Sequence, residues 1–284
     1  MFIQMYQEKY IRFPDGKAKA LTFSYDDGVE ADRHLLQIFK KYGLKGAFNL
    51  NNLLFDCRSW HGRMNEEETI AAFKGCGQEV AMHGARHIFM EKATLPEVVK
   101  EVADNRAYLE KTFGGVIRGM AYAYGSTGED IRRVLKDLGV AYARTTQSTF
   151  SFKIPDEWLR LNPTCHHRDK EFSALADKFL TGSPADEVKH REGWLFYVWG
   201  HAYEFDDDNN WELIENFAKR AAERSDIWHA TNIEVYDYVQ AYNRLQFSLD
   251  GERAYNPSAI PVWIEARGKV YKIAPAQTVT FDKV

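Results

Sequence analysis

Residues 20–28 read ALTFSYDDG, an apolar stretch that ends in two adjacent carboxylates, Asp26 and Asp27, and a glycine. The apolar part is typical of a buried β-strand. Neighbouring side chains on a strand point to opposite faces, but at the strand's end the backbone can turn both carboxylates toward one site. There, one carboxylate can bind a metal ion while the other abstracts a proton. An ordinary polar turn uses the same residue types, so the rest of the chain has to decide.

A second strand-like run, residues 79–87 (EVAMHGARH), carries His83 and His87 at spacing i and i+4. On one helical turn, this spacing puts both imidazoles on the same side, where they can bind a divalent ion. Gly84 argues against a long regular helix, so we expect a strand followed by a single turn. With Asp27, the set offers one oxygen and two nitrogen ligands and leaves room for water. That is the pattern of a catalytic metal site.

A third run, residues 194–201 (WLFYVWGH), is the most apolar stretch of the chain and ends in His201. It is long enough for a buried strand and too short to cross a membrane. A capped histidine in a loop would explain His201 taken alone. Three apolar runs that each end in Asp or His are harder to explain by packing.

The order and spacing of these motifs resemble those of the polysaccharide deacetylase family of carbohydrate esterases. Residues 22–28, 83–87, 119–125 (GMAYAYG) and 199–201 match the family's motifs in order, and the resemblance covers about residues 18–245. It implies a distorted, incomplete (β/α)7 barrel and a hydrolase that is active on amide bonds.

The resemblance also implies a role for each matched residue. Asp27, His83 and His87 would hold a divalent metal, expected to be zinc, with cobalt, nickel or manganese as alternatives. Asp26 would be the general base and His201 the general acid that protonates the departing amine.

In the segment 119–125, the resemblance implies that the backbone N–H of Tyr124 stabilises the oxyanion of the reaction. The segment departs from the family, however, because Ala121 and Ala123 stand where an arginine and a proline are common. That arginine normally orients the catalytic aspartate.

Arg144 ends the strand-like run 140–144, one unit further along the chain, and should reach the same rim of the barrel. We therefore expect Arg144 to form a charge-assisted pair with Asp26. A surface ion pair or a contact with substrate would explain Arg144 equally well.

Two other departures concern the first two motifs. Ser24 and Tyr25 are inserted before the aspartate pair, and Gly84 replaces the usual Ser or Thr. We expect the strand end to tolerate the insertion.

Aromatic and acidic residues beside the motifs are candidates for substrate binding: Tyr122, Trp199, Tyr203 and Glu204. Aromatic faces beside carboxylates suit stacking on a sugar ring, although ordinary packing explains each aromatic about as well. His166 and His167 follow a strand-like run, and we expect them in an exposed loop.

The coarse pattern alternates strands and helices, which indicates a parallel sheet with a site at the carboxyl ends of its strands. The expected strands are 19–25, 46–50, 79–82, 119–124, 140–144, 158–161 and 194–199. The expected helices are 31–42, 66–74, 95–113, 129–138, 171–180, 211–224 and 233–244. We expect residues 1–250 to form the barrel and residues 251–284 a small antiparallel β appendage packed on it.

Composition sets the remaining bounds. The chain has 284 residues, 45% of them hydrophobic, which suffices for a large core. A formal net charge of −4 gives no nucleic-acid footprint. Three scattered cysteines make no disulfide framework. No basic region followed by an apolar stretch opens the sequence, so we expect a cytoplasmic protein without a membrane partner.

The sequence therefore predicts a metal-dependent hydrolase that removes an acetyl group from an N-acetylated sugar or a related amide. The partner would be a small-molecule or oligosaccharide substrate. Two alternatives stay open: another C–N hydrolase on the same scaffold, and a carbohydrate-binding protein with a degenerate site.

Overall fold

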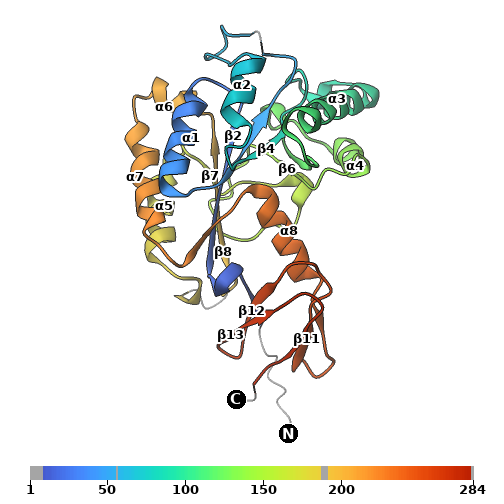
Figure 1. Ribbon diagram of the computed structural model, residues 1–284, viewed down its shortest axis with the longest axis vertical. Helices are drawn as coiled ribbons and strands as arrows, with labels where there is room; N and C mark the ends of the chain where they lie inside the picture. Colours follow the sequence, from blue (N-terminus) through green and yellow to red (C-terminus); the bar gives the residue numbers. More distant parts are fainter. Residues whose placement is uncertain (1–8, 56, 187–190, 283–284) are drawn as a thin grey trace.

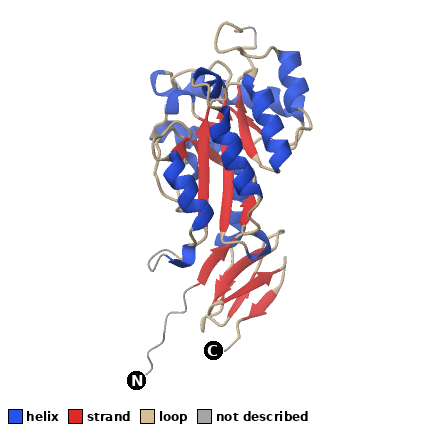
Figure 2. Cartoon of the chain, turned by 90° about the vertical axis from the view of Figure 1, so that its left-hand side faces the viewer, coloured by secondary structure: helices blue, strands red, loops and turns tan. Residues whose placement is uncertain are grey.

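A computed structural model describes residues 9–55, 57–186 and 191–282 of the chain. Its centre is a parallel β-sheet with strand order β6-β5-β4-β3-β2-β8-β7, and β9 pairs with the start of β2 (Figure 1). Helices flank the strands, and small antiparallel sheets lie at one end of the molecule (Figure 2). The predicted α/β class and distorted, incomplete seven-stranded barrel are confirmed.

The strands of the central sheet are short and buried. Their bounds are β2 Lys19–Asp26, β3 Gly46–Leu50, β4 Glu79–Met82, β5 Gly119–Ala121, β6 Tyr142–Arg144, β7 Cys165–His166, β8 Trp194–Gly200 and β9 Ile227–His229. The helices are α1 Ala31–Tyr42, α2 Glu66–Phe73, α3 Leu95–Phe113, α4 Glu129–Asp137, α5 Phe172–Thr181, α6 Tyr203–Asp207, α7 Trp211–Ala222 and α8 Asn232–Asn243. Within the described residues, none of the helices combines the length and apolar character that a membrane crossing requires.

Alternation along β2 decides which of its side chains reach the site. Leu21, Phe23 and Tyr25 pack into the core between the sheet and its outer helices. The residues between them face the barrel interior, where Thr22 bonds Asn232 of α8. Asp26 continues this inward-facing series. The interior position of one catalytic candidate therefore follows from the two-residue period of the strand.

The small antiparallel sheets combine a strand from the start of the chain with strands from its last forty residues or so. β1 (Lys9–Arg12) pairs with β12 (Val262–Ala266), which pairs with β13 (Lys269–Ile273). β10 (Gln246–Phe247), β11 (Arg253–Tyr255) and β14 (Thr278–Thr280) form the other sheet. The appendage thus draws on strands outside the expected range 251–284.

Three local predictions are wrong. Residues 158–161 were expected as a strand, but Trp158–Arg160 form a 3-10 turn, and only Leu161 bridges to Arg144. Residues 83–87 form an irregular loop rather than a helical turn. His166 and His167 are not in an exposed loop: His166 ends β7, and His167 is 2% exposed. Tertiary contacts override local pattern in each of these short segments.

Candidate active site

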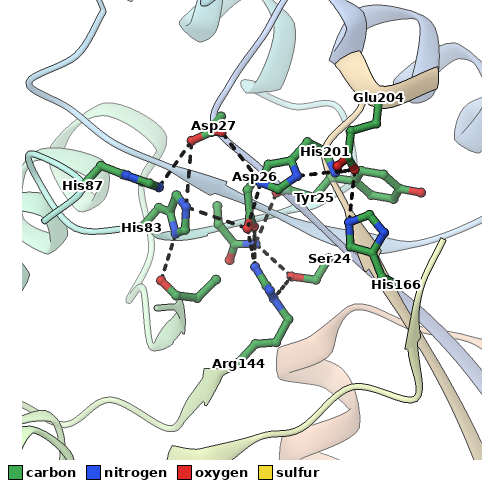
Figure 3. Close-up of polar contacts among 12 residues, drawn as sticks. Ser24, Tyr25, Asp26, Asp27, His83, His87, Arg144, His166, His201 and Glu204 are labelled. Atoms are coloured by element: carbon green, nitrogen blue, oxygen red, sulfur yellow. Dashed lines mark hydrogen bonds and ion pairs between the residues drawn. The ribbon is translucent and has the colours of Figure 1, made fainter. Parts of the chain in front are cut away.

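The carboxyl ends of the parallel strands bring together the polar residues that follow them. Asp26 ends β2, His83 follows β4, Arg144 ends β6 and His201 follows β8. Figure 3 shows these side chains pointing toward a common centre. Every residue expected to act as a ligand, base or acid lies in this cluster.

Asp27, His83 and His87 form the first group of ligand-type atoms. Asp27 Oδ1 lies 3.8 Å from His83 Nε2 and 3.8 Å from His87 Nε2 (Figure 3). These separations are too long for hydrogen bonds. All three side chains are buried.

The tautomer of His83 supports a cation at this point. His83 Nδ1 lies 2.9 Å from the carbonyl oxygen of Ala121, which can only accept, so Nδ1 carries the proton. Nε2 then presents a lone pair toward the oxygen of Asp27, and it has no hydrogen-bond partner among the described residues. Two buried acceptors facing each other are costly unless a cation lies between them. The donor set therefore fits a divalent metal ion.

Backbone conformation turns these ligands toward one another. Asp27 and His87 have positive φ angles of 86° and 57°, and Tyr124 has 57°. A left-handed residue other than glycine costs on the order of 1 kcal/mol or more, and such strain gathers at functional sites. The turn at Asp27 brings its carboxylate to the side already faced by Asp26, as the double-carboxylate motif required.

Gly84, which departs from the family's Ser or Thr, has a structural reason. Its φ is 78°, and a Cβ there would lie 2.8 Å from Glu101 Oε1. Glu101 is fully buried and accepts hydrogen bonds from the backbone N–H and Nε of Arg86. A carboxylate from α3 thus holds the loop at a position where a larger residue would collide with it.

Asp26 is held by a cation and an amide. Arg144 Nη2 donates to both carboxylate oxygens, 2.6 Å from Oδ1, and Asn49 Nδ2 donates to Oδ1 at 2.8 Å. The inserted Ser24 accepts from both Arg144 Nε and Asn49 Nδ2. The expected contact of Arg144 with Asp26 is present, while the role assigned to it stays a prediction. Sequence reasoning did not single out Asn49.

The ionisation of Asp26 follows from these contacts. Burial alone would raise its pKa, but the charge of Arg144, with smaller contributions from His83 and His201, lowers the pKa to about 2. Arg144 donates to both oxygens and Asn49 to Oδ1 alone, so Oδ2 has fewer donors and faces the site: it lies 3.7 Å from His83 Nε2 and 4.0 Å from His201 Nε2. Asp26 is therefore an ionised carboxylate with one oxygen directed at the centre.

His201 faces Asp26 and Asp27 with one nitrogen and Glu204 with the other. Its Nε2 is 3.9 Å from Asp27 Oδ2, and its Nδ1 is 3.4 Å from Glu204 Oε2 (Figure 3). Burial lowers the pKa of His201, but the Glu204 carboxylate beside Nδ1 and the nearby aspartates outweigh burial and raise it. A histidine in this setting can carry a proton to the centre of the site.

Glu204 is the hub of a second polar cluster. Its carboxylate lies 3.1 Å from His166 Nε2 and 3.2 Å from Arg168 Nη1, and it accepts the backbone N–H of His201 at 2.9 Å. His166, His201 and Glu204 also have the spacing of metal ligands. His166 Nδ1, however, accepts the backbone N–H of Arg168 at 3.0 Å, so a neutral His166 carries its proton on Nε2. This proton faces Glu204, and the cluster is a hydrogen-bonded one.

The expected substrate contacts lie in different settings. Tyr122 is 1% exposed and donates to the carbonyl of Leu159, so its ring has no free face for a sugar. Trp199 packs on the Arg144 guanidinium, 4.3 Å from its ring centre. Glu204 is occupied by the contacts above, because both of its oxygens accept from neighbouring residues. Of the four, Tyr203 keeps the most open position, half-buried and stacked on His61 with ring centres 3.8 Å apart.

Tyr124 lies beside the first ligand group. Its ring is 49% exposed, stacks on Phe89 with centres 3.9 Å apart, and lies 4.4 Å from the ring of His87. The ring of Tyr124 thus contacts one of the candidate ligands, and the role of its backbone N–H as an oxyanion donor stays a prediction.

Comparison with known proteins agrees with this arrangement. Residues 13–143 match the family model described as polysaccharide deacetylase. Over this segment, a little under half of the chain, the protein is similar to the polysaccharide deacetylase family. The matched segment contains both aspartates and both ligand histidines, but it ends before Arg144 and His201. No curated protein matches the chain significantly.

Solved structures of polysaccharide deacetylase relatives share the fold. A candidate polysaccharide deacetylase from Mycobacterium smegmatis is 18% identical, with a TM-score of 0.57 over 82% of this chain and 94% of that one. A family 4 acetyl xylan esterase from Clostridium thermocellum, in complex with a cobalt ion, is 16% identical, with a TM-score of 0.51 over 77% and 91%. A family 4 carbohydrate esterase pseudoenzyme from Bacillus anthracis is 14% identical, with a TM-score of 0.50 over 80% and 68%. At these identities, the likeness establishes the fold.

Proposed function

We propose that this protein is a metal-dependent hydrolase that removes an acetyl group from an N-acetylated sugar or a related amide. The observation that carries the proposal is the lone pair of His83 Nε2 facing Asp27 Oδ1 at 3.8 Å, with His87 Nε2 equally close to that oxygen. This arrangement stands next to an ionised base and a histidine acid. The acetyl xylan esterase solved with cobalt supports a divalent ion on this fold.

A divalent ion held by Asp27, His83 and His87 would polarise the amide carbonyl and lower the pKa of water. Asp26 accepts the proton of the attacking water at Oδ2, because Oδ1 accepts from both Arg144 and Asn49 whereas Oδ2 accepts from Arg144 alone and faces His83 and His201. His201 delivers a proton from Nε2 to the departing nitrogen while Glu204 holds Nδ1. Zinc is the proposed metal, because one oxygen and two nitrogen ligands with an open position suit it.

Metal content and acetate release together test the proposal. Purified wild-type protein should bind about one divalent ion. His83→Ala should lose the ion, while His34→Ala, which changes an exposed histidine of α1 whose ring contacts Trp211, should keep it. Equal metal content in all three proteins would rule out the assigned site.

Activity should be measured as acetate release from a panel of N-acetyl sugars and small amides, with and without added metal. We expect release that depends on metal and is lost in His83→Ala. A protein that binds the metal and a sugar but releases no acetate from any of these substrates would instead be a binding protein. The Bacillus anthracis pseudoenzyme shows that this fold also occurs without activity.

A further inference from the structure

Arg63 is a buried cation that contacts the site from outside the sequence motifs. Its side chain is 2% exposed, and Nη2 donates to Asp27 Oδ1 at 2.9 Å. The guanidinium lies over the ring of Trp60, 4.8 Å from its centre. Asp26 and Asp27 therefore each have an arginine of their own, and the arginine of Asp27 contacts the same oxygen that faces both histidines.

The second arm of Arg63 reaches the loop that carries the histidines. Arg63 Nη1 donates to Asn51 Oδ1 at 2.8 Å, and Asn51 Nδ2 donates to the carbonyls of His83 and Gly84, each at 2.7 Å. Asn51 is 2% exposed, so water does not compete for these bonds. One planar guanidinium thus links the Asp27 carboxylate to the backbone at His83 through a single side chain.

Backbone contacts hold Arg63 in place for this task. Arg63 forms a bridge with Val29, the Met64 N–H donates to the carbonyl of Gly28 at 3.0 Å, and the Glu30 N–H donates to that of Gly62 at 2.9 Å. The segment that carries Arg63 is therefore fastened to the chain directly after Asp27.

We propose that Arg63 is a positioning residue that, with Asn51, braces Asp27 against the His83–His87 loop in the geometry that receives a metal ion. The inference rests on the proposed function, because it concerns the same ligands. Strained ligand positions need such support. Asp27 and His87 have left-handed backbone conformations, and each of these costs about 1 kcal/mol or more. A planar fork with two donors can join two acceptors at a fixed angle, which a lysine cannot do.

Charge and positioning predict opposite effects on metal affinity. A guanidinium next to Asp27 repels a divalent cation, so repulsion alone would make its removal tighten binding. A brace predicts that removal weakens binding, and the loss of a partner that orients a metal ligand typically costs about 10–100-fold in affinity. The sign of the change in metal affinity therefore distinguishes charge repulsion from positioning.

The test is titration of metal-free protein with Co²⁺. Binding is monitored by calorimetry and by the visible absorption of the bound ion. Arg63→Met, which removes the charge but keeps much of the volume, should bind Co²⁺ about 10–100-fold more weakly than wild type. Arg63→Lys should fall between the two, and its Co²⁺ spectrum should differ from that of wild type. Affinity of Arg63→Met equal to or tighter than wild type would overturn the brace.

Asn51→Ala tests the second half of the brace without leaving a buried charge unpaired, because Asp27 still contacts Arg63. It should also weaken Co²⁺ binding, and Arg63→Met combined with Asn51→Ala should cost less than the sum of the single changes. Strict additivity, or unchanged affinity in Asn51→Ala, would contradict the proposal. This variant also decides the matter if Arg63→Met does not fold.

Arg12→Met is the matched control, since Arg12 is also buried and pairs with Glu265 at 2.7 Å on the small sheet. It should lower thermal stability and leave Co²⁺ affinity unchanged. If wild type itself bound no Co²⁺, the metal site and the brace would fall together. If wild type and Arg63→Met bound it equally, the brace alone would fall.

Discussion

Two carboxyl groups lie at opposite ends of the strands of the central sheet, and their pKa values are shifted in opposite directions. Asp26, at the carboxyl end of β2, has Arg144 against both oxygens, and its pKa is lowered to about 2. Glu79, at the amino end of β4, accepts from the Tyr142 hydroxyl at 2.7 Å and the Ile233 N–H at 2.8 Å, and burial raises its pKa to about 7. Asp26 is the more deeply buried of the two and yet has the lower pKa, so burial does not explain the difference.

The difference in pKa follows from the hydrogen-bonding partners of each carboxyl group. A full charge in contact stabilises the ionised form, whereas neutral donors do not repay the loss of hydration. The carboxyl end of the sheet therefore holds an ionised carboxylate, the proposed base. The amino end holds a carboxyl group with a raised pKa, which joins β4, β6 and α8. A substitution at one end of the sheet leaves the other end unchanged as a reference.

The largest effect is expected at Asp26. Asp26→Asn removes the base but keeps the shape and the contact with Arg144, so activity should fall by roughly 100-fold or more. Metal content, measured by elemental analysis, should be unchanged, because Asp27, His83 and His87 remain. Loss of the metal in Asp26→Asn would mean that the two aspartates exchange roles.

Arg144→Ala should raise the pKa of Asp26, because it removes the charge that offsets burial. Asp26 acts only when ionised, so activity is lost as pH falls through its pKa. The acidic limb of the rate profile should therefore move to higher pH, and activity at neutral pH should drop by roughly tenfold or more. Arg144→Lys should restore part of the loss. An acidic limb that does not move in Arg144→Ala would show that the pair does not set the pKa.

Glu204→Gln should act on the basic limb instead. The negative charge of Glu204 helps to raise the pKa of His201, which acts as an acid and fails as pH rises through that pKa. Without the charge, the basic limb should move to lower pH, with a loss of roughly tenfold near pH 8. Asp208→Asn, which changes a partner of Arg168 that does not contact His201, is the control. A limb that moves equally in both variants would argue against a specific role for Glu204.

Much of the fold was predictable, because its signals are local. Strand 46–50 and helices 31–42 and 95–113 were predicted to the residue from their strand-like and helical sequence patterns. The ligand, base and acid candidates could be found because each follows an apolar run. β7 has two residues and β9 three, which is too short for any period to show.

The supporting residues could not be found in this way. Asn49, Asn51 and Arg63 contact the aspartates only once the strands are aligned side by side, and nothing in their own surroundings marks them. Arg144 was inferable because it ends a strand, and strands of a parallel sheet end at one edge. Glu204 was selected for sugar binding because it follows His201, but its partners His166 and Arg168 are more than thirty residues away.

The smallest effect is expected at Glu79 and appears in stability rather than activity. Its folded pKa of about 7 exceeds the ordinary value of 4.5, so the folded state holds the proton more tightly than the unfolded state. The stability that the protonated group supports is fully present below pH 4.5 and is lost as pH rises toward 7. At one to two units above the ordinary value, the loss amounts to ~1–3 kcal/mol, from 1.36 kcal/mol per pKa unit. Glu79→Gln keeps an acceptor for the Ile233 N–H and cannot ionise. It should therefore unfold at a higher urea concentration than wild type at pH 7.5 and at a similar concentration at pH 4.5. Urea unfolding at both pH values measures this difference.

A stability gap between the two proteins that is the same at both pH values would show that Glu79 is ionised in the folded state. The contrast between the two ends of the sheet would then have to be abandoned.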